Sequence, residues 1–136
     1  MVKAELFHAN FSYSDLTGAC FDGADIAQAR FVSAVLNGLA MPGSTLDGTN
    51  FENAIMNNAN LARIIAKGAT FRKAELTGSI FDHAHLQNGS FREAVCEHNK
   101  HLNLIKINRN AKFRRSNHFV FDVKTVHNSE FWTAFF

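Results

Sequence analysis

The chain has 136 residues, of which 46% are hydrophobic, and its 14 Lys and Arg against 12 Asp and Glu give a formal net charge of +2. A chain of this length predicts one domain with a tail. No stretch approaches the roughly 20 apolar residues that a membrane-spanning helix needs, and Met1–Glu5 shows no apolar signal-peptide core. We therefore expect a cytoplasmic protein without a membrane span, although an uncleaved address for a specialised bacterial secretion system would leave no such trace.

A five-residue repeat runs from residue 4 to residue 96, nineteen times and without an insertion. In nearly every unit a small residue is followed two places later by a large apolar one, as Ala4 is by Leu6 and Ala9 is by Phe11. Five matches neither the 3.6-residue period of a helix nor the two-residue period of a strand. The pattern therefore predicts a repeat architecture.

A second period of twenty residues lies inside the first. Every fourth large position is aromatic, and the series reads Phe11, Phe31, Phe51, Phe71 and Phe91. A column of identical side chains is typical of a solenoid in which each turn stacks on the next. Twenty residues in four sides of five predict a four-sided solenoid of just under five coils, which at about 4.8 Å per coil is roughly 23 Å long.

The slot two places after the large residue is rich in glycine and asparagine, which tolerate turn conformations. It therefore predicts the corners of each coil. The inward small position explains the pair Ile64 and Ala66, in which a large residue in the small slot is matched by a small one in the large slot. Leu39 with Met41 breaks this compensation and Pro42 follows, so we expect a local distortion there.

Several units resemble the A(D/N)LXX signature of pentapeptide-repeat proteins: Ala24-Asp25-Ile26, Ala59-Asn60-Leu61 and Ala74-Glu75-Leu76. The resemblance implies an all-β fold, a right-handed quadrilateral β-helix over residues 1–98. The Asp/Asn slot is degenerate, since Val35, Ile55, Ile65, Ile80 and Val95 also occupy it. Membership of such a family does not by itself fix a function, because function resides in sites.

The remaining residues, 99–136, form a basic and aromatic tail without a repeat. From residue 97 onward the chain carries seven Lys and Arg against three acids. The tail is interpreted as a cap for the last coil, as a homodimer contact, or as a segment with little fixed structure. Its candidate interface residues are Phe119, Phe121, Trp132 and Phe135.

Candidate chemistry is sparse. His83, His85, His98 and His101 crowd the last coil, but their spacing sends them to different sides, so we interpret them as surface residues and expect no metal site. Cys20 and Cys96 lie about 18 Å apart along the predicted axis, too far for a disulfide. No nucleophile motif is present and a filled solenoid offers no deep pocket. We expect a non-enzymatic protein without a cofactor.

Binding is the class of function that remains. Val35 and Ile55 fall on consecutive coils of one wall and predict a small exposed apolar strip, which favours a bacterial protein-interaction or scaffold module with an unknown protein partner. Some proteins of the family that the chain resembles mimic DNA and bind a type II topoisomerase, so this is the alternative, with a secreted effector module as a further one. The alternative needs a continuous acidic stripe, and the outward residues predict none; we also expect no nucleic-acid binding.

Overall fold

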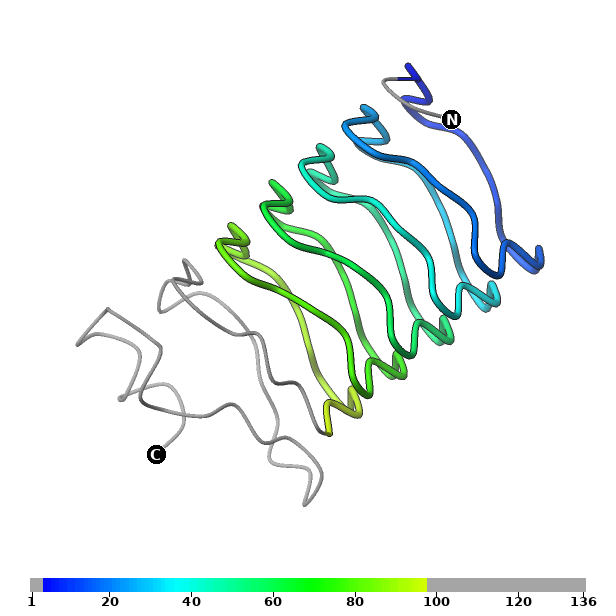
Figure 1. Cartoon of the computed structure of the whole chain (residues 1–136), viewed down its shortest axis with the longest axis vertical. Coiled ribbons are helices and arrows are strands. Elements are labelled where there is room, and N and C mark those ends of the chain that lie inside the picture. The colour runs from blue at the N-terminus through cyan, green and yellow to red at the C-terminus, as the bar shows by residue number, and fades with distance from the viewer. Residues whose placement is uncertain (1–3, 98–136) are drawn as a thin grey trace.

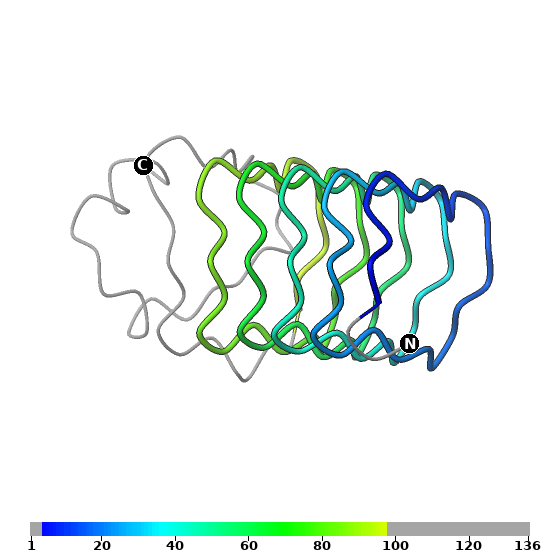
Figure 2. The same ribbon diagram turned by 90° about the horizontal axis from the view of Figure 1, so that it is seen from above.

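The computed structural model describes residues 4–97, and these residues form a straight rod of stacked coils (Figures 1 and 2). Each coil is twenty residues long and has four sides, so the predicted right-handed quadrilateral β-helix is confirmed. The sides are held to their neighbours by single parallel β-bridges between residues twenty apart, of which Glu5–Asp25, Asn10–Arg30 and Asp15–Val35 are the first three. The described residues contain no helix, and no strand extends beyond these bridges.

Four walls follow from the bridge register. The outward bridge residues of the first wall are Glu5, Asp25, Thr45, Ile65 and His85, and those of the second are Asn10, Arg30, Asn50, Thr70 and Ser90. The third wall carries Asp15, Val35, Ile55, Glu75 and Val95, and the fourth Cys20, Ala40, Asn60 and Ile80. Two turn residues separate each wall from the next and form the edges of the rod, so each edge is named here by the two walls that it joins.

Each edge is a tight turn whose geometry the five-residue unit dictates. In the first one the N–H of Ala9 donates to the carbonyl of Leu6 at 3.0 Å, and His8 between them has a φ of 60°. A positive φ at the third residue with this hydrogen bond is the pattern of a type II turn. The predicted corner slot is confirmed at every turn, but eleven corners are not glycine, and residues such as Tyr13 and Lys73 also adopt the left-handed conformation.

The first turn residue has an N–H that points away from the ladder and needs an acceptor. The Asp/Asn slot supplies it: Asn60 Oδ1 accepts the N–H of Ala62 at 3.1 Å, and Asn10, Asp15, Asp25 and Asn50 do the same in their own units. Where that slot is apolar, the preceding coil can supply the acceptor, as Asp47 does for the N–H of Lys67 at 2.8 Å. In the units of Ile55 and Ile65, a side chain of the preceding coil therefore satisfies this donor.

Proline at the first turn position is a third way to avoid an unsatisfied N–H, and Pro42 occupies that position. The distortion expected around Pro42 is absent. The ladder continues through this coil, where the N–H of Gly23 donates to the carbonyl of Pro42 at 3.0 Å and Ala40 bridges to Asn60. Pro42 occupies the first central position of its turn, where its fixed φ suits a type II turn and its missing N–H removes the donor altogether. Leu39 and Met41 are both fully buried, so the core accepts the larger pair.

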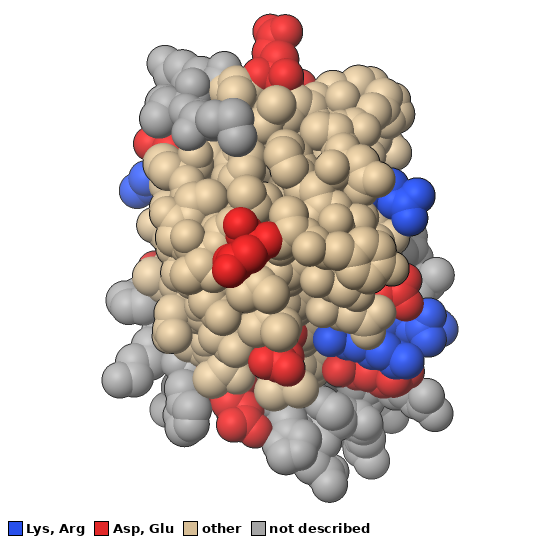
Figure 3. Space-filling model, turned by 90° about the vertical axis from the view of Figure 1, so that its right-hand side faces the viewer, with Lys and Arg blue, Asp and Glu red and all other residues tan. Residues whose placement is uncertain are grey.

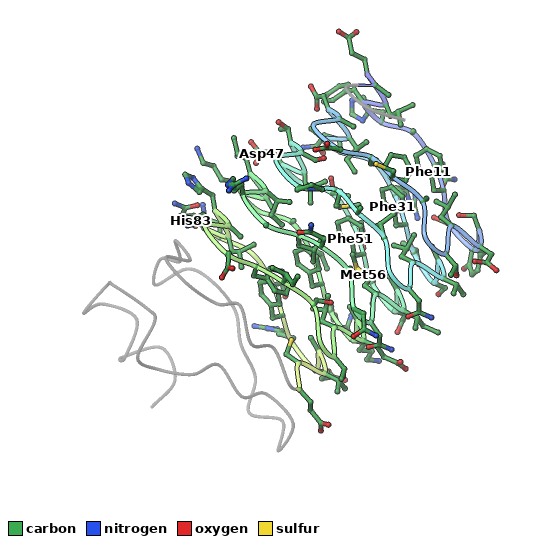
Figure 4. The ribbon with its side chains drawn as sticks, in the orientation of Figure 1. Phe11, Phe31, Asp47, Phe51, Met56 and His83 are labelled. Carbon is green, nitrogen blue, oxygen red and sulfur yellow. The ribbon has the colours of Figure 1, made fainter. Side chains whose placement is uncertain are left out.

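The interior is filled by the small and large residues, as predicted. Phe31, Phe51 and Phe71 stack nearly parallel with ring centroids 5.0 Å apart, and Figure 4 shows Phe11, Phe31 and Phe51 succeeding one another along the rod. Ile64 and Ala66 are both fully buried, which confirms their exchange of volume. Residues of the first coil such as Phe11 are only partly buried because no described coil lies beyond them.

Three hydroxyl groups enter this apolar interior with a defined partner. Ser44, Thr49 and Ser79 occupy small slots, and each hydroxyl donates to the carbonyl of a large residue in the preceding coil, at 2.6, 2.9 and 2.7 Å. A buried hydroxyl without a partner would cost stability, so these contacts explain how Ser and Thr replace alanine. Within residues 4–97 no helix is long and apolar enough to cross a membrane. The predicted boundary at residue 98 and the tail lie outside the described residues.

Candidate interaction surface

Val35 and Ile55 lie directly opposite each other on the third wall, as a parallel β-bridge between consecutive coils. Their backbones are joined by the N–H of Ile55, which donates to the carbonyl of Ala34 at 3.0 Å. Both residues are half-buried rather than fully exposed. The two residues of the expected strip are therefore neighbours, but they expose less apolar surface than a fully exposed pair would.

A ladder of side-chain amides lies beside this pair, on the edge between the third and fourth walls. Asn37 Oδ1 accepts the backbone N–H of Asn57 at 3.1 Å, and Asn57 Oδ1 accepts that of Thr77 at 2.9 Å. Asn57 Nδ2 also donates to Glu75 Oε2 at 3.2 Å. These bonds fix the side chains across three coils, so a partner that docks on this edge would lose little conformational entropy in ordering them.

Between residues 17 and 80, the outward residues of this edge and of the adjoining fourth wall include no Asp, Glu, Lys or Arg, and Glu97 is the next residue of the edge. We call these outward residues the uncharged surface: Thr17, Gly18, Cys20, Asn37, Gly38, Ala40, Asn57, Asn58, Asn60, Thr77, Gly78 and Ile80. The uncharged surface extends along four coils. Sequence reasoning found Val35 and Ile55 but missed this larger feature, because it appears only when turn residues twenty apart are read as columns.

Acidic residues border the uncharged surface on both sides. Asp15 and Glu75 stand on the third wall, and Asp22 and Asp82 stand on the edge between the fourth and first walls, with Arg63 as the basic residue at this border. The other basic residues of the described chain lie elsewhere on the rod: Arg30, Lys67, Arg72, Lys73 and Arg92. The border is therefore acidic in balance.

Asp15 is fixed at this border by its own turn. The Thr17 hydroxyl donates to Asp15 Oδ1 at 2.7 Å and the Thr17 N–H donates to the same oxygen at 3.0 Å. These two hydrogen bonds, the hydroxyl first, lower the pKa of Asp15 below its ordinary value. The carboxylate is therefore charged at neutral pH and held in one orientation.

Ion pairs occur on a different edge, between the second and third walls. Arg72 Nη1 lies 3.2 Å from Glu52 Oε1, and Lys73 Nζ lies 3.9 Å from Glu93 Oε2, each pair joining consecutive coils. Acids and bases therefore alternate there instead of forming a column of one sign. Figure 3 shows one long face of the molecule on which acidic groups stand singly among uncharged residues and basic groups lie toward the margins.

A scan for pentapeptide repeats matches eight copies within residues 1–38, 44–82 and 66–95, which together cover more than half of the chain. The chain belongs to the pentapeptide-repeat family. No curated protein matches it with comparable significance. The family assignment agrees with the described coils, whose bridges repeat every twenty residues.

Solved pentapeptide-repeat proteins share the fold at low sequence identity. Rfr23 from the cyanobacterium Cyanothece 51142 is 17% identical with a TM-score of 0.78, over 83% of this chain and 90% of that one. A pentapeptide-repeat protein of the Arabidopsis thaliana thylakoid lumen is 20% identical with a TM-score of 0.66, over 84% and 73%. HetL from Nostoc sp. PCC 7120, involved in heterocyst differentiation regulation, is 17% identical with a TM-score of 0.52, over 81% of this chain and 57% of its own. These likenesses describe the shape and not the activity.

The other candidate residues of this pentapeptide-repeat chain do not converge. Cys20 is exposed on the fourth wall whereas Cys96 is buried in the third-wall core column, and burial raises the pKa of the Cys96 thiol. His83 stands on an edge, pointing outward in Figure 4, and His85 on the first wall. Within residues 4–97 no three His, Cys, Asp or Glu side chains are grouped to hold a metal ion. Phe119, Phe121, Trp132 and Phe135 lie outside the described residues.

Proposed function

We propose that this pentapeptide-repeat protein is a non-enzymatic interaction module that binds another protein through Val35, Ile55 and the adjoining uncharged surface. The observation that carries the proposal is the combination of a paired apolar strip with a hydrogen-bonded amide ladder on one edge of a rigid rod. Depletion of charge at the centre with charge at the border is the usual composition of a protein interface. The inner side chains from Phe21 to Cys96 are buried, so the chemistry available to a partner is that of the outer surface.

The test compares two double substitutions in the full-length protein. Val35→Asp with Ile55→Asp places two carboxylates in the strip, whereas Thr45→Asp with Ile65→Asp makes the same change in a bridged pair on the opposite, first wall. We expect a protein captured from source-cell lysate by the wild type to be retained by the first-wall variant and lost by the third-wall variant. Equal recovery by both variants would remove the strip from the binding site, and equal thermal unfolding midpoints would show that neither change acts through folding.

The DNA-mimic alternative finds less support in the charge distribution. On the third wall Asp15 and Glu75 are separated by Val35 and Ile55. On the first wall the consecutive acids Glu5 and Asp25 are followed by Thr45, Ile65 and His85, so no wall of the described rod carries a continuous acidic stripe. DNA presents closely and regularly spaced phosphates of one sign along each strand. A supercoiling assay with a type II topoisomerase, with and without a quinolone, tests this alternative directly. The interaction-module proposal predicts unchanged activity and unchanged drug sensitivity at micromolar protein.

A further inference from the structure

The described chain ends on the edge that carries the amide ladder. Glu97 occupies the same turn position as Thr17, Asn37, Asn57 and Thr77, and its carbonyl accepts the N–H of Gly78 at 2.8 Å. Residues 98–136 therefore begin at one end of the uncharged surface. The four coil steps back to Thr17 span only about 19 Å, which six or seven extended residues cover at about 3.3 Å each.

The composition of residues 98–136 complements that surface. They contain seven Lys and Arg against the two acids Asp122 and Glu130, so they are strongly basic. The border of the uncharged surface is acidic, with Asp15, Asp22 and Glu75 among its residues. The segment also contains aromatic residues that suit an apolar pair such as Val35 and Ile55: Phe113, Phe119, Phe121, Phe131, Trp132, Phe135 and Phe136.

We propose that residues 98–136 dock in cis on the uncharged surface and cover Val35 and Ile55. Aromatic side chains contact the apolar pair, and Lys and Arg side chains face the acidic border. A tether that starts on the same edge gives the segment a local concentration on the order of millimolar, so weak contacts suffice to hold it. A second copy of the rod fits the surface less well, because its own acidic border would face Asp15 and Glu75.

Docking of this segment makes it a built-in competitor for the protein partner, a consequence that rests on the proposed function. The segment and the partner would use the same apolar pair, so release of the segment exposes the site. Docking of the segment is measurable without any partner. The docking proposal and the proposed partner binding can therefore be disproved separately.

Trp132 is the single tryptophan of the chain and lies in the segment, so it serves as the energy donor. The dye must lie outside the uncharged surface, which includes Cys20. In a Cys20→Ser background, Asn53→Cys places an exposed thiol on the edge between the second and third walls, and Cys96 is buried, so a thiol-reactive acceptor dye labels position 53 selectively. We expect energy transfer from Trp132 to the dye in this full-length protein, which is the reference for the variants below. Transfer should fall roughly twofold or more when docking is lost, because the segment then samples a larger volume.

Three conditions should lower transfer. The first is the strip variant, Val35→Asp together with Ile55→Asp, and the second is the charge-reversal variant, Lys112→Glu together with Arg114→Glu and Arg115→Glu. The third is about 1 M salt, where the Debye length is about 3 Å. The charge reversal lies outside the solenoid, so it tests docking even where the strip variant disturbs the fold. Thr45→Asp with Ile65→Asp should leave transfer unchanged.

The proposal is wrong if the strip and charge-reversal variants both match the reference protein. It is equally wrong if an excess of unlabelled protein abolishes transfer, because the occupant is then a second copy. Once docking is established, the charge reversal should also increase capture of the partner; failure of that step alone would count against the proposed function.

Discussion

The side-chain oxygen of Asn57 accepts the backbone N–H of Thr77, twenty residues further along the chain, at 2.9 Å. Thr77 follows Glu75 in the slot where other units carry Asp or Asn, so the preceding coil supplies the acceptor that this turn needs. The contact links two coils as well as completing a turn. Substitution of Asn57 therefore tests how far the ladder stabilises the rod.

Asn57→Ala should lower the free energy of unfolding by about 1–3 kcal/mol, because the N–H of Thr77 loses its acceptor in a half-buried position. Asn57→Asp keeps an acceptor oxygen but brings a second carboxylate toward Glu75, so we expect a smaller loss. Urea denaturation of both variants measures the difference. An Asn57→Ala midpoint equal to that of wild type would show that water replaces the side chain at no cost.

Phe51→Ala should cost about 3–5 kcal/mol, because the ring is fully buried and its removal leaves a cavity. Phe51 stacks on both Phe31 and Phe71, whereas Phe11 at the first coil is only partly buried. Phe11→Ala should therefore cost clearly less. Thermal or urea unfolding of the two variants gives the comparison, and equal losses would contradict the difference in packing.

Arg63→Gly should stabilise the protein by about 0.5–1 kcal/mol. Arg63 holds a φ of 58°, which costs an L-residue about 1–2 kcal/mol, and glycine adopts it freely at a smaller cost in unfolded-chain entropy. Ala62→Gly is the control at the neighbouring position, where φ is not positive, and it should destabilise. The pair is measured by the shift in the thermal midpoint, and a loss of stability in Arg63→Gly would mean that its side chain contributes more than the strain.

Cys96 should make stability fall at high pH. Burial raises the pKa of its thiol, so the native protein keeps the proton while the unfolded chain loses it above its ordinary pKa of about 8.5. The contribution of the neutral thiol is complete below that pH and is lost above it, by about 1.4 kcal/mol per pH unit. Urea denaturation between pH 7 and 10 measures the slope as the difference from Cys96→Val, which removes the group. The same slope in both proteins would assign the pH dependence to other residues.

The interior could be predicted from the sequence because five-residue and twenty-residue periods leave few ways to bury the apolar positions. The phenylalanine column that begins at Phe11 follows from the twenty-residue period. The burial of both Ile64 and Ala66 follows from the constant volume that their two core positions share. Corners such as Tyr13 and Lys73 could not be recognised from residue type, since the neighbouring coils and not local preference impose their positive φ. The distortion expected at Leu39, Met41 and Pro42 was wrong, because the core accommodates both large side chains and Pro42 lies in a turn that suits its fixed φ.

The candidate surface was less accessible to sequence reasoning. Val35 and Ile55 stand out as apolar residues in a polar slot, and their pairing follows from the twenty-residue register. The amide ladder does not, because Asn37 and Asn57 look like ordinary turn residues until their side chains are seen to reach the next coil. Register predicts which residues are neighbours, and side-chain geometry decides which of them interact.

The twenty-residue register also restricts how such a chain can change in length. Loss of one complete coil leaves every later residue above a residue of its own column, so the phenylalanine stack closes again over a shorter rod. Loss of a single five-residue unit keeps the small-and-large rhythm but rotates everything after it by one wall. If the lost unit lies between Val35 and Phe51, Phe51 would then lie over Ile26 instead of Phe31, and Val35 would no longer meet Ile55. Viable length variants of this rod should therefore differ by whole coils.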